Sequence, residues 1–89
     1  MELREAEERL SSLGYRELYL WQAPPHTQYP WHPHPEDEAR LVLEGEVTIG
    51  TEDEVYHLKA GDLLEIKAGT RHWARTEKGV KYLCGSRKA

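Results

Sequence analysis

The stretch that decides the fold runs from Trp31 to Gly45 and reads Trp-His-Pro-His-Pro-Glu-Asp-Glu-Ala-Arg-Leu-Val-Leu-Glu-Gly. His32 and His34 are two residues apart, so in extended backbone their side chains point to the same face. Glu38 keeps this even spacing, and Gly45 ends the stretch where a turn is needed. The pattern therefore predicts extended chain with three potential metal ligands on one face.

A second stretch, Gly61 to Thr76, supplies one more potential ligand, His72. Three imidazoles and one carboxylate form a mixed nitrogen and oxygen set that suits Fe(II), Mn, Ni, Cu, Co or Zn. Such a set leaves coordination positions open to water or substrate, which is typical of a catalytic site. The alternative is that the four residues are ordinary polar side chains. Their spacing favours a site for one divalent transition metal ion, with His32, His34, Glu38 and His72 as its ligands.

Both stretches resemble the two conserved motifs of the cupin superfamily. The first cupin motif is Gly, five residues, His-x-His, three or four residues, Glu, six residues, Gly, and the second is Gly, five residues, Pro-x-Gly, two residues, His, three residues, Asn. This chain has His32-x-His34, three residues, Glu38, six residues, Gly45, and then Gly61, five residues, Lys67-x-Gly69, two residues, His72, three residues, Thr76. It departs from the motifs at His26, Lys67 and Thr76, but all four ligand positions are filled.

The resemblance implies an all-β fold, a small double-stranded β-helix (jelly-roll barrel) with the metal near its interior mouth. It does not fix the reaction, because cupins include dioxygenases, isomerases, epimerases, decarboxylases, sensor domains and storage proteins. Residues 37–45 are also similar to the corresponding stretch of acireductone dioxygenases, which are much longer proteins.

The rest of the chain predicts a short helix followed by closely spaced strands. Apolar residues recur at helical spacing before Gly14, which indicates an amphipathic helix within residues 1–14. All five prolines lie in residues 24–35, which predicts a stiff extended loop leading into an edge-like strand. Turn signals separate the expected strands, which are Arg16–Gln22, Ala39–Leu43, Glu46–Gly50, Val55–Leu58, Asp62–Ile66, His72–Thr76 and Val80–Cys84. Residues 1–89 are expected to form one domain, with the barrel in residues 16–84.

Arg40 shares the inward face with Glu38 and Val42 if the strand alternates regularly. A charge that points into a small barrel needs an anionic partner or a ligand. One interpretation is that Arg40 binds a carboxylate or enolate oxygen of a substrate beside the metal, and the other is that it pairs with Glu38. Glu38 and Arg40 are therefore the candidate catalytic residues.

Composition narrows the possible partners. The 89 residues include 12 basic and 16 acidic side chains, a net charge of −4 that argues against nucleic-acid binding. No apolar run is long enough to cross a membrane, the first residues are too acidic for a signal peptide, and the single cysteine, Cys84, cannot form an internal disulfide. A cytoplasmic protein is expected, and its small size favours a homodimer.

Several other side chains have two interpretations. Four aromatic residues are either pocket walls or contacts in the core or a dimer: Tyr29, Trp31, Trp73 and Tyr82. His26 is expected in a surface loop, His57 on a strand, and the acidic residues of 44–54 on a solvated face. The sequence predicts a mononuclear-metal enzyme, dioxygenase-like or isomerase-like, that acts on a small oxygen-rich or anionic molecule. The alternative is a metal-dependent binding or sensor module without turnover.

Overall fold

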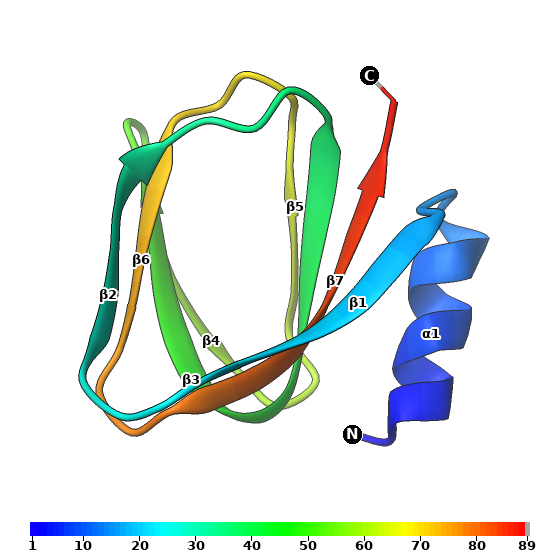
Figure 1. Ribbon diagram of the computed structural model, residues 1–89, viewed down its shortest axis with the longest axis horizontal. Coiled ribbons are helices and arrows are strands. Elements are labelled where there is room, and N and C mark those ends of the chain that lie inside the picture. Colours follow the sequence, from blue (N-terminus) through cyan, green and yellow to red (C-terminus); the bar gives the residue numbers. More distant parts are fainter. Residues whose placement is uncertain (89) are drawn as a thin grey trace.

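The computed structural model describes residues 1–88, which form one helix and seven strands (Figure 1). The elements in chain order are α1 (Leu3–Ser12), β1 (Glu17–Ala23), β2 (Thr27–His32), β3 (Asp37–Thr51), β4 (Val55–Lys59), β5 (Leu63–Ile66), β6 (His72–Thr76) and β7 (Val80–Arg87). No helix in residues 1–88 has the length and apolar character needed to cross a membrane.

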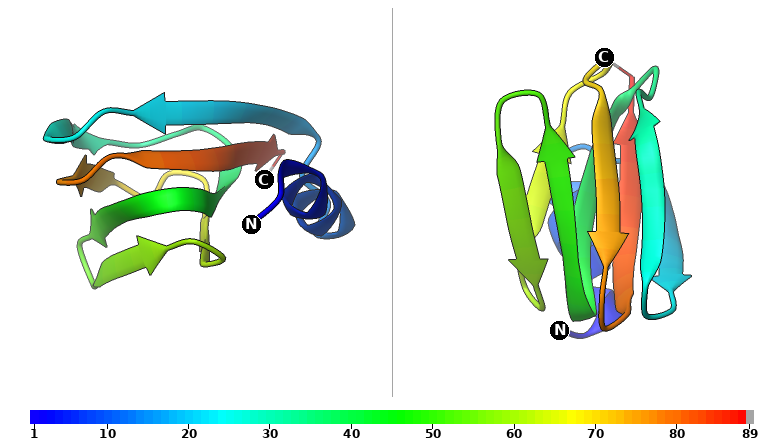
Figure 2. Two further views of the ribbon diagram at one scale, coloured as in Figure 1. Left: turned by 90° about the horizontal axis from the view of Figure 1, so that it is seen from below. Right: turned by 90° about the vertical axis from the view of Figure 1, so that its left-hand side faces the viewer.

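Two antiparallel sheets share the long strand β3. Its first half lies between β7 and β5, and β1 adds to the far side of β7. Its second half lies between β4 and β6, and β2 adds to the far side of β6. The right-hand view of Figure 2 shows β4, β3, β6 and β2 side by side. The two sheets curl around one interior, which confirms the predicted small β-barrel.

The expected turn at Gly45 is wrong, because residues 39–43 and 46–50 belong to one continuous strand. The register of β3 against β7 shifts between Val42 and Glu44, and Gly45 has a φ of 78°. A side chain at Gly45 would meet the backbone oxygen of Gly79, because an added Cβ would lie 2.1 Å from it. Glycine here bends the strand from one sheet into the other without ending it.

The expected proline-rich loop is also partly wrong, because residues 27–32 form strand β2. Pro30 is tolerated there since β2 is the outer strand of its sheet and pairs only with β6 among residues 1–88. The register against β6 is broken between Tyr29 and His32. The predicted edge strand is therefore present, although its pairing is irregular. The expected stiffness of this segment stays a prediction.

Side chains of β3 alternate between two apolar clusters. In the first half of β3, odd-numbered residues such as Leu41 face α1 on the outside of the barrel, with Ala6, Leu10, Tyr15, Ala39, Leu43 and Leu83. Val42 faces the interior, and beyond the register shift between Val42 and Glu44 the alternation is reversed, so that Val47 and Ile49 also face the interior. The other members of this interior cluster are Ala23, Leu58, Ile66, Ala74, Val80, Tyr82 and Cys84. The predicted amphipathic helix therefore packs on the outer face of one sheet and contributes no residue to the interior cluster. It ends as expected, with Gly14 in the left-handed region and the Tyr15 N–H donating to the Leu10 carbonyl.

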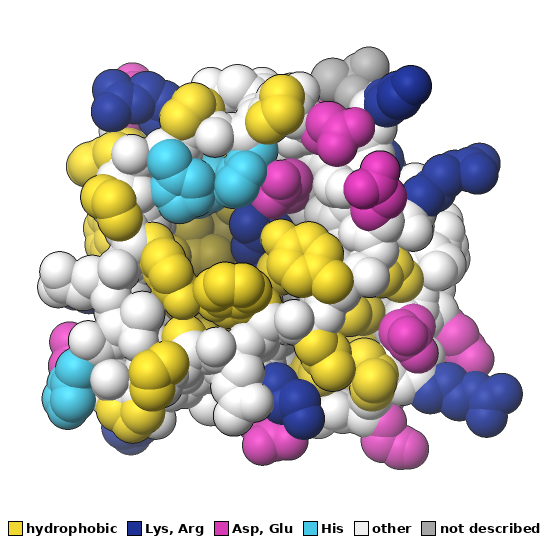
Figure 3. Space-filling view, viewed as in Figure 1, with side chains coloured by type: hydrophobic (Ala, Val, Ile, Leu, Met, Phe, Trp, Pro, Cys, Tyr) yellow, Lys and Arg dark blue, Asp and Glu magenta, His cyan; other side chains and the backbone are white. Residues whose placement is uncertain are grey.

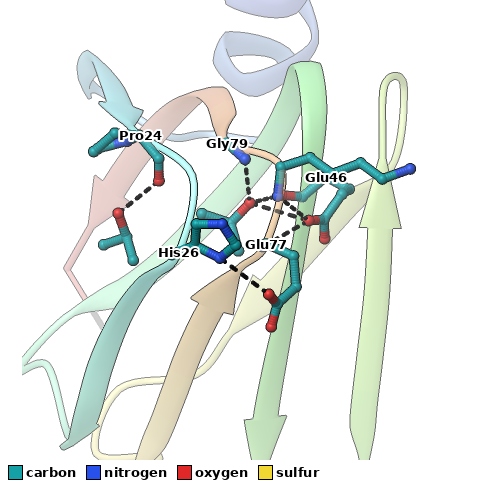
Figure 4. A network of polar contacts seen from close by, with 8 residues as sticks. Pro24, His26, Glu46, Glu77 and Gly79 are labelled. Carbon is teal, nitrogen blue, oxygen red and sulfur yellow. Dashed lines mark hydrogen bonds and ion pairs between the residues drawn. The ribbon is translucent and has the colours of Figure 1, made fainter.

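Glu46 stabilises the turn between β6 and β7, whereas the sequence indicated only that it belongs to a solvated acidic face. Its carboxylate accepts the backbone N–H groups of Glu77 at 2.9 Å and Lys78 at 3.1 Å. The Thr76 hydroxyl donates to the Glu46 carbonyl at 2.6 Å and accepts the Gly79 N–H at 3.0 Å. Figure 4 shows this network beside the exposed His26–Glu77 pair. Thr76, which replaces the expected asparagine, thus ties the β6–β7 turn to β3.

Replacing Gly45 with alanine is expected to destabilise the fold by about 2 to 4 kcal/mol, because it adds a backbone clash to a left-handed conformation. Urea unfolding measures the effect. Gly61→Ala is the matched control, since Gly61 has a φ of 93° but no atom within 4 Å of an added Cβ. It should cost only about 1 to 2 kcal/mol, and equal losses in both variants would contradict the role assigned to the close contact.

Replacing Glu46 with glutamine is expected to lower the free energy of unfolding by about 1 kcal/mol at pH 7. Hydrogen bonding from the Lys78 N–H is the main cause that lowers the pKa of Glu46 from its ordinary 4.5. Because the pKa is lower in the folded state, the contribution is fully present above pH 4.5 and is lost as the pH falls below it. Unfolding curves from pH 7 to pH 3 should therefore converge for the two proteins. Exposed Glu44 provides the control variant, Glu44→Gln, with an expected change below about 0.5 kcal/mol.

Candidate metal centre

Three histidines from the two predicted stretches meet inside the barrel mouth. His32 ends β2, His34 lies in the loop before β3, and His72 begins β6. Their ring centroids are 4.5 to 5.1 Å apart, and one ligand atom from each lies within 4.8 Å of the other two. Bonds of about 2.1 Å to one ion place nitrogens roughly 3 to 3.5 Å apart. A small inward movement of the rings is therefore enough to bind a single ion.

Each histidine has its Nδ1 atom held by the protein. The His32 Nδ1 lies 2.6 Å from the Pro30 carbonyl, and the His72 Nδ1 lies 3.0 Å from the Thr70 carbonyl. The His34 Nδ1 lies 3.1 Å from a Glu38 carboxylate oxygen. These contacts select the ring form that carries its proton on Nδ1 and leaves the Nε2 lone pair free. The Nε2 of His34 is buried without a hydrogen-bond partner among residues 1–88, as expected for an atom that binds a metal.

Glu38 does not belong to the group of converging ligand atoms. One of its oxygens contacts His34, and the other accepts a hydrogen bond from Arg40 at 2.7 Å. In this arrangement the carboxylate orients the ring of a candidate metal ligand, as carboxylates beside zinc-bound histidines do. The structure thus brings three of the four predicted ligands together, and ligation by Glu38 stays a prediction.

Burial keeps the rings of His34 and His72 in the form that metals bind. Burial is the main cause that lowers the pKa of His34 and of His72, and Arg40 and the neighbouring imidazoles lower both pKa values further. Glu38 opposes the change at His34, and the hydrogen bond to the Thr70 carbonyl opposes it at His72. Both imidazoles are therefore neutral at neutral pH, and metal binding there requires little proton release.

Arg40 points inward, as its place in β3 predicts, and is 7% exposed. Its guanidinium pairs with Glu38, donates to the Ala39 carbonyl at 3.2 Å and lies 5.9 Å from the centroid of the Tyr82 ring. An arginine has five N–H donors, so pairing with Glu38 leaves donors for a further acceptor. The two interpretations of Arg40 are therefore compatible, and its role toward a substrate stays a prediction.

A cavity of about 260 Å³ adjoins the histidines, and Arg40 is part of its wall. Figure 3 shows the opening, where histidine side chains lie beside a basic group and apolar side chains line the hollow. Two of the expected aromatic walls, Tyr29 and Tyr82, line this cavity, whereas Trp31 and Trp73 line a depression that includes neither the histidines nor Arg40.

Sequence reasoning missed two aromatic cavity residues, Tyr19 and Trp21. The available signal was that Tyr19 and Trp21 are two residues apart in a strand. This spacing places both side chains on the face opposite Leu18, whose side chain packs with the apolar cluster around α1. Cys84 belongs to the cavity wall together with Tyr82. Burial raises the pKa of its thiol, so that the thiol is protonated at neutral pH and is not an activated nucleophile.

The chain is similar in sequence to known proteins. A family model described as a cupin domain matches residues 19–85. The uncharacterized protein YdbB of Bacillus subtilis is 44% identical over 63 residues, and an acireductone dioxygenase of Sulfurihydrogenibium is 35% identical over 57 residues. These alignments cover 68% and 60% of this chain but only 56% and 32% of the two relatives.

Solved structures agree with this fold. A cupin-2 domain protein of Shewanella frigidimarina has a TM-score of 0.70 at 26% identity, with 79% of this chain and 69% of that protein aligned. The DMSP lyase DddQ of Ruegeria pomeroyi has a TM-score of 0.74 at 29% identity, with 79% of this chain but 36% of the lyase aligned. The barrel described here therefore corresponds to part of several longer proteins.

Replacing His72 with alanine is expected to weaken Co(II) or Zn(II) binding by more than about 100-fold, because loss of a ligand should exceed the 10- to 100-fold effect of outer contacts. Competition with a chelator of known affinity measures the change. His57→Ala is the matched control, since His57 is exposed and contacts Thr48 instead of the histidine group. Metal binding that is equally strong in both variants would contradict the assigned centre.

Proposed function

We propose that this chain, which belongs to the cupin domain family, is a mononuclear-metal enzyme, dioxygenase-like or isomerase-like, acting on a small oxygen-rich or anionic organic molecule. The observation that carries the proposal is the convergence of His32, His34 and His72, each with its Nδ1 held and its Nε2 left free. A divalent transition metal ion bound there polarises substrate oxygens or presents O2 to the substrate.

The residues beside the histidines have distinct proposed roles. Arg40 donates from its spare N–H groups to a carboxylate or enolate oxygen and so orients the substrate. Glu38 keeps Arg40 in place through its 2.7 Å contact and fixes the ring of His34. We also propose that the same carboxylate accepts a substrate proton or, after rotation about its side-chain bonds, serves as a fourth ligand, as the sequence predicts. Burial of Arg40 and His72 limits water around the reacting groups.

The relatives support this class of function without fixing the reaction. One is an acireductone dioxygenase, and the solved structures include a lyase. Both proteins are much longer than the matched region, so neither substrate is assigned to this chain. The predicted cytoplasmic location and homodimer, with neither nucleic acid nor membrane as a partner, also stay predictions from the sequence.

Metal analysis and turnover assays on the full chain test the proposal. The protein purified without added metal is expected to contain one transition metal ion per chain, identified by elemental analysis. Loaded with that ion, it should consume O2 with, or isomerise, at least one compound from a panel of enediols, β-diketones and phenols. Arg40→Leu should keep the metal and lose turnover, and His72→Ala should lose both.

Two outcomes count against this function. Tight binding of a panel compound to the metal-loaded protein without any turnover would favour the alternative, a metal-dependent sensor module. Failure of the histidine group to retain any transition metal would overturn both functions.

Because Arg40→Leu leaves Glu38 without its partner, Arg40→Lys serves as a second variant that keeps the charge but loses the planar fork of donors.

A further inference from the structure

The cavity beside the histidines has two unlike ends. One end carries the three imidazoles and Arg40, the only permanent cation that lines it among residues 1–88. The other end is aromatic and apolar and includes Trp21, Tyr29 and Ala74, which lie one strand pair beyond Arg40 and the histidines. The Tyr82 ring lies between the two ends, 5.9 Å from the Arg40 guanidinium, and Tyr19, Ile49 and Cys84 complete the wall. No Asp or Glu side chain of residues 1–88 belongs to the wall. The cavity therefore matches a molecule with one anionic end and one apolar end.

A single side-chain pair joins the free edges of the two sheets at the apolar end. Within residues 1–88, β1 pairs only with β7 and β2 only with β6, so β1 and β2 form no ladder with each other. The Trp21 indole N–H donates to the Tyr29 hydroxyl at 2.8 Å. The two rings meet edge to face, with centroids 6.3 Å apart. We call this contact the aromatic bridge.

The chain fixes where the two strands separate. Pro24 and Pro25 precede His26, whose φ of 61° reverses the chain, and the His26 N–H donates to the Glu77 carbonyl. Figure 1 shows β1 and β2 leaving this corner toward different sheets. The aromatic bridge spans the gap between β1 and β2 close to this corner. Its two side chains therefore close the cavity at a place where, within residues 1–88, no backbone ladder joins the two strands.

We propose that the aromatic bridge is the wall that sets ligand size, and that the ligand is a small carboxylate with a short apolar tail. This inference rests on the proposed function, because it places the carboxylate at Arg40 and the metal centre. The tail extends toward Trp21 and Tyr29. A cavity of 260 Å³ holds roughly nine groups of about 30 Å³ each, and the carboxylate takes three of them, so the tail has room for about six carbon atoms.

Straight-chain carboxylates from acetate to octanoate, added to the Co(II)-loaded full chain, test the inference. Visible absorption of the bound Co(II) reports each dissociation constant. In the natural protein, affinity should rise by about fourfold for each added CH2 until the tail reaches the bridge, and then fall. Trp21→Ala should move the best chain length upward by at least two carbons. Tyr29→Phe, which keeps the ring but loses the acceptor, should shift it in the same direction by less.

The control is Trp31→Ala, the same change at a tryptophan that does not line this cavity. It should leave the preferred chain length unchanged. Trp21→Phe also removes the indole N–H, with a smaller loss of side-chain volume than Trp21→Ala. It replaces Trp21→Ala in this experiment if that variant does not fold.

Two results overturn the inference while the metal centre stands: a chain-length preference that is the same in the natural protein and all the bridge variants, or Co(II)-loaded protein that binds none of the carboxylates. Failure to bind Co(II) at all is a failure of the proposed function instead, and the absorption spectrum before any carboxylate is added distinguishes the two cases.

Discussion

The candidate metal centre depends on which nitrogen of each histidine is already held by a contact within the protein. His32 and His72 use the same local device, in which the ring Nδ1 contacts the carbonyl two residues earlier in the chain. A carbonyl is available to His32 because the ladder between β2 and β6 is broken between Tyr29 and His32. An irregularity that weakens the sheet thus supplies the acceptor that orients a ligand.

The long strand β3 brings the two halves of the site together. Its first half carries Glu38 and Arg40, and its second half pairs with β6, which begins at His72. Because Gly45 bends the strand without ending it, both halves face one interior. A hairpin at this position would separate the two groups into independent strands. The bend is therefore as important to the site as any ligand, although it lies far from the histidines.

The sequence predicted those parts that depend on strand alternation and motif spacing. The inward side chains of Arg40 and Val42 follow from alternation along β3, and the meeting of His32, His34 and His72 follows from the cupin spacing. The bend at Gly45 did not follow, because glycine with positive φ serves a turn and a bent strand equally well. Nor can spacing decide whether a Glu38 oxygen faces an ion or the ring of His34, since rotation about its side-chain bonds reaches both.

The position of Glu38 couples the metal centre to the candidate substrate site. Its two oxygens contact groups with different proposed roles, His34 at one end of the carboxylate and Arg40 at the other. A change that moves the guanidinium also affects Glu38 as the acceptor of the His34 Nδ1 proton, and an ion held by His34 would strengthen that ring as a donor to Glu38. Substitutions at these positions should therefore act together rather than independently. We therefore expect Glu38, which contacts both His34 and Arg40, to link the candidate metal centre to the candidate substrate site.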